Sequence, residues 1–113
     1  MKNVVIVGAG KEGKGTFGDI FYENKWNITF IDKDENVINS LNEKNSYIVE
    51  ALYENYNEKH IIDHYHAYLI DDYTNSYESI LNADVIVLAL YPEDIKEALS
   101  KLKFSLQKRI KML

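Results

Sequence analysis

The sequence predicts a single α/β domain with a mainly parallel sheet flanked by helices. Two observations predict this class: short β-branched runs alternate with amphipathic helical segments, and turn residues separate the two kinds of segment. A chain of 113 residues buries enough apolar surface for one core only. We therefore expect residues 1–113 to form one domain.

The first half of the chain follows this alternation closely. The apolar run over residues 2–7 predicts a fully buried strand that stops at Gly8, and helical spacing predicts a helix over 13–24. A second strand is expected over 28–31, and Asp34 is placed to cap the helix that follows it.

The segment from residue 46 to 70 departs from simple alternation. A polar stretch at 54–58 interrupts two runs of alternating apolar residues, which predicts an inserted β-hairpin around 46–64. A third core strand is then expected at about 67–70.

The last part of the chain predicts a short helix from Ser76 to Leu81 and a strongly apolar strand over 84–90. A further helix is expected to begin at Pro92. Proline is tolerated in the first turn because the backbone N–H that it lacks would have no partner there. The apolar face of this helix comprises Ile95, Leu99 and Leu102. About four such strands correspond to the first half, with a little added, of a dinucleotide-binding sheet.

Composition excludes several classes of function. The net charge of −5 creates no field that favours nucleic acid, and no apolar run reaches the roughly 18–20 residues of a membrane span. The chain has no cysteine, which excludes thiolate chemistry and agrees with a cytoplasmic location. The C-terminal cluster of lysines and arginine is interpreted as a solvated helix face and tail.

The first predicted strand ends in a glycine-rich turn with the pattern G-x-G-x-x-G. The turn comprises Gly8, Ala9, Gly10, Lys11, Glu12 and Gly13. A strand before it and a helix after it are the context of a Rossmann-type dinucleotide site, in which the helix start binds the pyrophosphate. Gly8 would permit the sharp turn, Gly10 the approach of the cofactor, and Gly13 close helix–strand packing. The alternative is a tight turn without a ligand.

Asp32 ends the second predicted strand, nineteen residues after Gly13. A carboxylate at this position accepts hydrogen bonds from the ribose hydroxyls of NAD and repels the 2′-phosphate of NADP. The neighbouring Lys33 weakens this discrimination, since a cation can meet a phosphate. We expect NAD rather than NADP; the alternative role for Asp32 is a helix cap.

Further positions are candidates for cofactor contact. Gly15 and Gly18 lie in the predicted helix, where each costs about 1 kcal/mol relative to alanine, so a ligand or a facing element should pack closely there. Ala89 and Tyr91 follow the last core strand and are expected near the nicotinamide-side ribose.

Three histidines, His60, His64 and His66, are expected on one face of a strand. That spacing makes a metal site conceivable. No carboxylate or cysteine spacing supports it, so we predict no metal site and no catalytic residue in this chain.

The glycine-rich segment of residues 7–18 resembles the G-A-G-x-I-G-R-G-F-I-G opening of the mannitol-1-phosphate 5-dehydrogenase and long-chain mannitol dehydrogenase family. Residues 29–32 are similar to that family's second strand, and Leu41-Asn42 with Ser46-Tyr47 resembles a further segment. The resemblance covers about residues 3–100. Glu12, Lys14 and Tyr91 depart from the family pattern.

The resemblance implies the N-terminal Rossmann domain of a larger, NAD-dependent enzyme that transfers hydride between a polyol and a ketose without a metal. The family's catalytic lysine lies in a helical C-terminal domain, so this chain alone is expected not to be catalytic. The alternative is a nucleotide-sensing Rossmann module of the potassium-transport type. A third possibility is that the isolated domain binds no ligand tightly because its sheet is incomplete, and self-association through an exposed sheet edge or the final helix is then expected.

Overall fold

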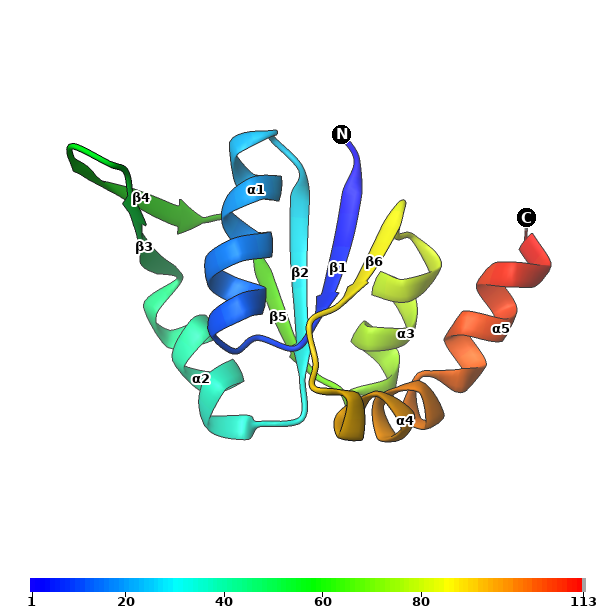
Figure 1. The fold of residues 1–113 in the computed structure, drawn as a ribbon. Helices are drawn as coiled ribbons and strands as arrows, with labels where there is room; N and C mark the ends of the chain where they lie inside the picture. The colour runs from blue at the N-terminus through cyan, green and yellow to red at the C-terminus, as the bar shows by residue number, and fades with distance from the viewer. Residues whose placement is uncertain (113) are drawn as a thin grey trace.

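The computed structural model describes residues 1–112 and confirms the predicted α/β fold (Figure 1). A four-stranded parallel sheet has the order β5-β2-β1-β6, and a two-stranded antiparallel hairpin lies beside it. The strands are β1 (Asn3–Val7), β2 (Asn27–Asp32), β3 (Ser46–Leu52), β4 (Asn57–Asp63), β5 (His66–Leu69) and β6 (Val85–Leu88). The helices are η1 (Glu12–Phe17), α1 (Gly18–Glu23), α2 (Glu35–Lys44), α3 (Tyr73–Leu81), α4 (Pro92–Lys101) and α5 (Lys103–Met112).

β1 is a central strand of the sheet, paired with β2 on one side and β6 on the other. Its residues Val4, Val5, Ile6 and Val7 are each no more than 1 % exposed, which confirms the predicted fully buried strand. A strand that is apolar on both faces needs a helical layer over each of them.

The two helical layers lie on opposite faces of the sheet (Figure 1). On one face, Ile6 and Phe30 pack with Leu41 of α2 and with α1. On the other, Val7 packs with Ile80 of α3 and with Leu102 at the end of α4. The alternation of side chains along β1 therefore supplies both cores from one short strand.

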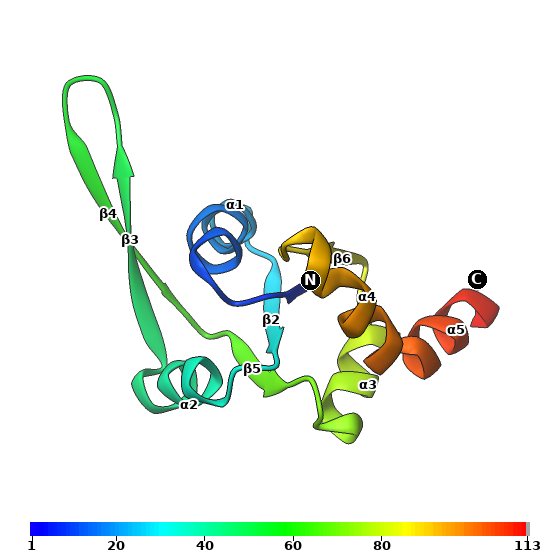
Figure 2. The ribbon, with the colours of Figure 1, turned by 60° about the horizontal axis from the view of Figure 1, so that its bottom comes forward.

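The predicted hairpin is confirmed and spans β3 and β4. Its tip extends away from the α/β body, as Figure 2 shows. Its base is anchored by three aromatic rings: Tyr47 lies 6.1 Å from Phe30 and 5.6 Å from Tyr65, measured between ring centroids. The Tyr47 hydroxyl also donates to the carbonyl oxygen of Lys14 in η1, at 2.8 Å.

The third helix begins earlier than predicted. α3 starts at Tyr73 rather than Ser76, because Asp72 is its cap: a carboxylate oxygen accepts the Asn75 N–H at 3.1 Å. Ser76 is buried inside the helix, and its hydroxyl donates to the carbonyl oxygen of Leu69 at 2.9 Å.

The C-terminal part also differs from the prediction. β6 is shorter than the predicted strand over 84–90, and it lies at the edge of the sheet. Leu99 does not belong to the apolar face of α4, since it is 40 % exposed, whereas Ala98 and Leu102 are buried. The helix breaks at Leu102, and the expected solvated tail is a separate helix, α5.

Among the described residues, no helix combines the length and the apolar character that a membrane crossing requires.

We expect Gly18→Ala and Tyr47→Phe to be coupled. A Cβ atom at Gly18 would lie 2.4 Å from the Tyr47 hydroxyl oxygen, so Gly18→Ala should cost about 1–3 kcal/mol of overpacking. Tyr47→Phe alone should cost about 1 kcal/mol through the lost hydrogen bond, yet it removes the atom that alanine strikes. Urea unfolding should show a double variant more stable than the sum of the single effects; strict additivity would contradict this contact.

Candidate functional site

The glycine-rich turn passes between the carboxyl ends of three strands. The Gly8 N–H donates to the Ile31 carbonyl at the end of β2, at 2.7 Å. Gly8 has a φ of 106°, and a Cβ atom there would lie 2.3 Å from the carbonyl oxygen of Ala89, just after β6. Both facts require glycine, which confirms the predicted turn.

Gly13 holds the helix start directly against this turn. A Cβ atom at Gly13 would lie only 1.9 Å from the Gly8 carbonyl oxygen. The predicted helix over 13–24 begins as π-helix in η1, where the Gly18 N–H reaches the Gly13 carbonyl five residues back, and becomes α-helical only in α1. π-turns of this kind occur frequently at functional sites.

Gly10 and Gly15 behave differently from these two glycines, because an added Cβ would meet nothing within 4 Å. Both line an open hollow of about 850 Å³ between the glycine-rich segment and the hairpin, together with Ala9, Lys11 and Glu12. Gly18 instead packs against Tyr47. Of the two glycines that follow the G-x-G-x-x-G turn, Gly15 therefore faces open space and Gly18 packs against a side chain.

A second, smaller hollow of about 190 Å³ lies at the carboxyl ends of the sheet strands. It is lined by six of the candidate residues: Gly8, Gly10, Asp32, Lys33, Ala89 and Tyr91. Gly10 thus borders both hollows, and every candidate residue except the buried Gly13 and Gly18 lines one of them. The positions singled out in the sequence converge around one turn.

Asp32 is the last residue of β2 and bonds to two backbone segments. One carboxylate oxygen accepts the Ala9 N–H at 2.6 Å, and the other accepts the Asp34 N–H at 2.8 Å. A carboxylate has about four acceptor positions, so each oxygen keeps capacity for a further donor. Asp34, not Asp32, caps α2, as the sequence predicted.

Lys33 is half exposed and lies between two acidic side chains of α4. Its Nζ atom is 3.5 Å from Asp94 Oδ1 and 3.6 Å from Glu97 Oε2. These carboxylates, Glu97 foremost, raise the pKa of Lys33. Sequence reasoning missed Asp94 and Glu97, although both line the smaller hollow; their three-residue spacing in the helix opened by Pro92 was the available signal.

Tyr91 immediately precedes α4 and is 74 % exposed. Its carbonyl oxygen accepts the Asp94 N–H at 2.9 Å, so the backbone of this turn is held while the ring points into solvent. The backbone of Ala89 is also held, since its N–H donates to the Val7 carbonyl oxygen at 2.8 Å.

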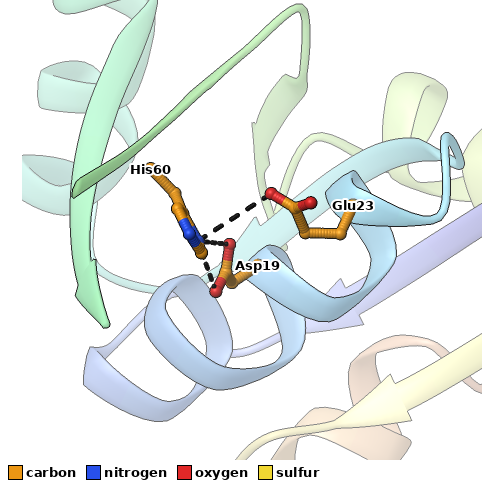
Figure 3. A group of neighbouring side chains, drawn as sticks. All are labelled: Asp19, Glu23 and His60. Atoms are coloured by element: carbon orange, nitrogen blue, oxygen red, sulfur yellow. Dashed lines mark hydrogen bonds and ion pairs between the residues drawn. The ribbon is translucent and has the colours of Figure 1, made fainter. Parts of the chain in front are cut away.

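The three histidines do not share a strand face, contrary to the prediction. His64 lies in the turn after β4 with a φ of 54°, and His66 belongs to β5 in the main sheet. His60 faces α1 from β4, where it contacts Asp19 and Glu23 (Figure 3). Hydrogen bonding to Asp19 raises the pKa of His60.

A parallel sheet of this order, with a glycine turn at the start of the first helix and an acid at the end of the second strand, defines a dinucleotide-binding Rossmann domain. The family model described as the mannitol dehydrogenase Rossmann domain matches residues 2–113. The chain therefore belongs to the mannitol dehydrogenase family, which confirms the resemblance seen in the sequence.

Individual relatives agree with this family. The chain is 31 % identical over 103 residues to a mannitol-1-phosphate 5-dehydrogenase of Thermoanaerobacter pseudethanolicus. The aligned region covers 91 % of this chain and 26 % of that protein. It is 31 % identical over 99 residues to the enzyme of that name from Ajellomyces capsulatus, covering 84 % of this chain and 25 % of the relative. A Streptococcus mutans enzyme of the same name is 46 % identical over 50 residues, or 44 % of this chain and 13 % of that protein.

The chain thus spans about a quarter or less of the length of these relatives. Family membership implies a nicotinamide dinucleotide as the cofactor. The comparisons give no support to the potassium-transport alternative.

We expect Gly13→Ala and Gly15→Ala to have opposite effects on stability. Gly13→Ala forces a methyl group onto a backbone oxygen that cannot rotate away, which should cost about 1–3 kcal/mol or more. Gly15→Ala adds a methyl group in open space within a helix and should stabilise by up to about 1 kcal/mol. Urea unfolding measures both; equal destabilisation would contradict the packing described for Gly13.

Proposed function

We propose that this chain supplies the NAD-binding domain of a polyol dehydrogenase that acts on mannitol 1-phosphate or a closely related polyol. The observation that carries this proposal is the open face of Gly10, which borders both hollows next to Asp32 in a domain of the mannitol dehydrogenase family.

The residues present fit a dinucleotide. The free N–H groups at the start of η1 and the positive end of the helix dipole favour the pyrophosphate beside Gly10, Lys11 and Glu12. The spare acceptor capacity of Asp32 suits the two hydroxyls of the adenosine ribose. Ala89 and Tyr91 border the same hollow and would contact the nicotinamide-side ribose.

The nicotinamide ring would supply the chemistry, which is acceptance or donation of a hydride. The named relatives are mannitol-1-phosphate 5-dehydrogenases, so a polyol phosphate and its ketose are the substrates we infer for the whole protein. We assign no catalytic residue to this chain, whose role is to bind and orient the cofactor.

We further propose that NAD is preferred over NADP. Lys33 is the cation nearest Asp32 in sequence, but its ammonium group is already engaged by Asp94 and Glu97. The three carboxylates of Asp32, Asp94 and Glu97 line the same hollow, where a 2′-phosphate would meet net negative charge.

Self-association also remains a proposal. β6 is an edge strand with Val85 37 % exposed, and α5 exposes large apolar side chains: Phe104, Ile110 and Met112. An open edge and an apolar helix face are the two routes by which a second copy would bind.

Calorimetric titration tests the binding proposal directly. We expect the chain to bind NADH, and Gly10→Val to weaken binding at least about ten-fold, equivalent to roughly 1.4 kcal/mol. A Cβ atom at Gly10 meets nothing within 4 Å in the free protein, so we expect the effect of valine to report on the space that the pyrophosphate needs rather than on folding. Asp32→Ala should weaken NADH binding as well, through the lost ribose contacts.

Glu43→Gln, an exposed carboxylate on α2, is the matched control for the loss of one negative charge and should bind NADH like the parent chain. NADH affinity that is unchanged in Gly10→Val and Asp32→Ala would reject the assignment of the site.

The cofactor preference is tested by the double variant Asp94→Asn with Glu97→Gln. These changes release Lys33 from its two partners, so NADPH affinity should rise several-fold while NADH affinity changes little. The same titration with Lys33→Met added should abolish the gain. An NADPH affinity that stays constant across these variants would show that Lys33 does not face the 2′-phosphate position.

A further inference from the structure

A cluster of titratable side chains lies between helix α1 and the hairpin (Figure 3). Asp19 and Glu23 are four residues apart in one helical segment, which places both carboxylates on the same helix face. His60 reaches the same point from β4, where it pairs with Val49 across the hairpin. The ligand atoms of the three residues lie within 4.8 Å of one another.

The cluster contains more carboxylates than one protonated imidazole can neutralise. His60 Nδ1 lies 2.8 Å from Asp19 Oδ1 and 3.8 Å from Glu23 Oε1. On the other side of the ring, Nε2 lies 3.3 Å from Glu58 Oε1. Three carboxylates therefore surround one imidazole, and a singly charged ring leaves the group with net negative charge.

The distances fit a transition-metal ion. Around tetrahedral Zn²⁺, ligand atoms at about 2.0–2.1 Å from the metal are roughly 3.4 Å apart. The observed separations from His60 Nδ1, 2.8 Å to Asp19 and 3.8 Å to Glu23, lie on either side of this value. One imidazole and two carboxylates are a donor set that suits Zn²⁺.

Although the sequence alone predicts no metal site, we propose that Asp19, Glu23 and His60 form a binding site for a divalent transition metal, with Zn²⁺ as the fitting ion. His60 Nδ1 and one oxygen from each carboxylate are the protein ligands, and water completes the coordination. The ion takes the place of the proton between His60 and Asp19.

The surroundings of the three ligands support this site. His60 and Asp19 have side chains only 14 % and 19 % exposed, so their positions are held by packing, while Glu23 is 58 % exposed and leaves a path for the ion. The Glu58 carboxylate at Nε2 is the partner that orients a metal-bound imidazole. Asp19 also borders the larger hollow, where water has access.

The consequence of metal binding is a firmer attachment of the hairpin. α1 continues directly from η1, and the hairpin already donates a hydrogen bond from Tyr47 to Lys14 in η1. An ion shared by α1 and β4 adds a second link between the same two parts. The proposed metal does not depend on the proposed cofactor, and each can fail without the other.

Titration of the chain with zinc chloride, after removal of metals by EDTA, tests the proposal. We expect saturable binding of one Zn²⁺ per chain and a higher melting temperature with the ion bound. Co²⁺ in its place should give the visible absorption of a four-coordinate N/O site. Glu58→Gln should keep the stoichiometry and weaken binding about ten-fold or more through loss of the outer partner.

His60→Gln should abolish the site, and Glu23→Gln should weaken it strongly. Because Glu23 is largely exposed, its variant keeps the test valid if His60→Gln fails to fold. His64→Gln is the matched control, since this histidine is 88 % exposed and lies outside the cluster. Binding that is absent in the parent chain, that survives Glu23→Gln unchanged, or that is lost equally in His64→Gln would overturn the proposal.

Discussion

The contact between the start of the first helix and the end of the first strand is the constraint on which the rest of the site depends. Gly13 approaches the Gly8 carbonyl so closely that no side chain fits between them, and Gly8 itself is pressed against Ala89. This approach brings the end of β1 and the start of η1 to one point of the sheet edge. The backbone of Gly10 then borders both hollows, where the proposed pyrophosphate would lie.

The charged groups around this turn are arranged by long-range contacts. Asp32 joins the turn to β2 through the Ala9 N–H, so the carboxylate that would bind a ribose also holds the glycine-rich segment in place. Lys33 is turned toward α4 by Asp94 and Glu97. On the hairpin side of this segment, burial raises the pKa of Tyr47. Its hydroxyl therefore stays protonated and donates a hydrogen bond to the Lys14 carbonyl oxygen in η1. The hairpin and the second strand thus stabilise the same segment from two directions.

The sequence was sufficient for features with a local cause. The buried first strand, the glycine turn, the Asp34 cap and the hairpin each follow from residues that are neighbours in the chain, and all are present. Features that depend on distant partners could not be predicted. His60 and Asp19 are 41 residues apart, and only the fold shows that β4 faces α1. The exposure of Leu99 likewise depends on how α4 lies on the sheet, which helical periodicity alone does not determine.

The central claim is that a nicotinamide dinucleotide binds across Gly10 and Asp32. A titration of the isotope-labelled chain with NADH, followed through its backbone amide NMR signals, tests this claim most directly. We predict saturable shifts at residues 8–16, at Asp32 and Lys33, and at residues 89–91, with little change at the hairpin tip and α5. No shifts at high NADH concentration, or shifts confined to the hairpin or α5, would contradict the account.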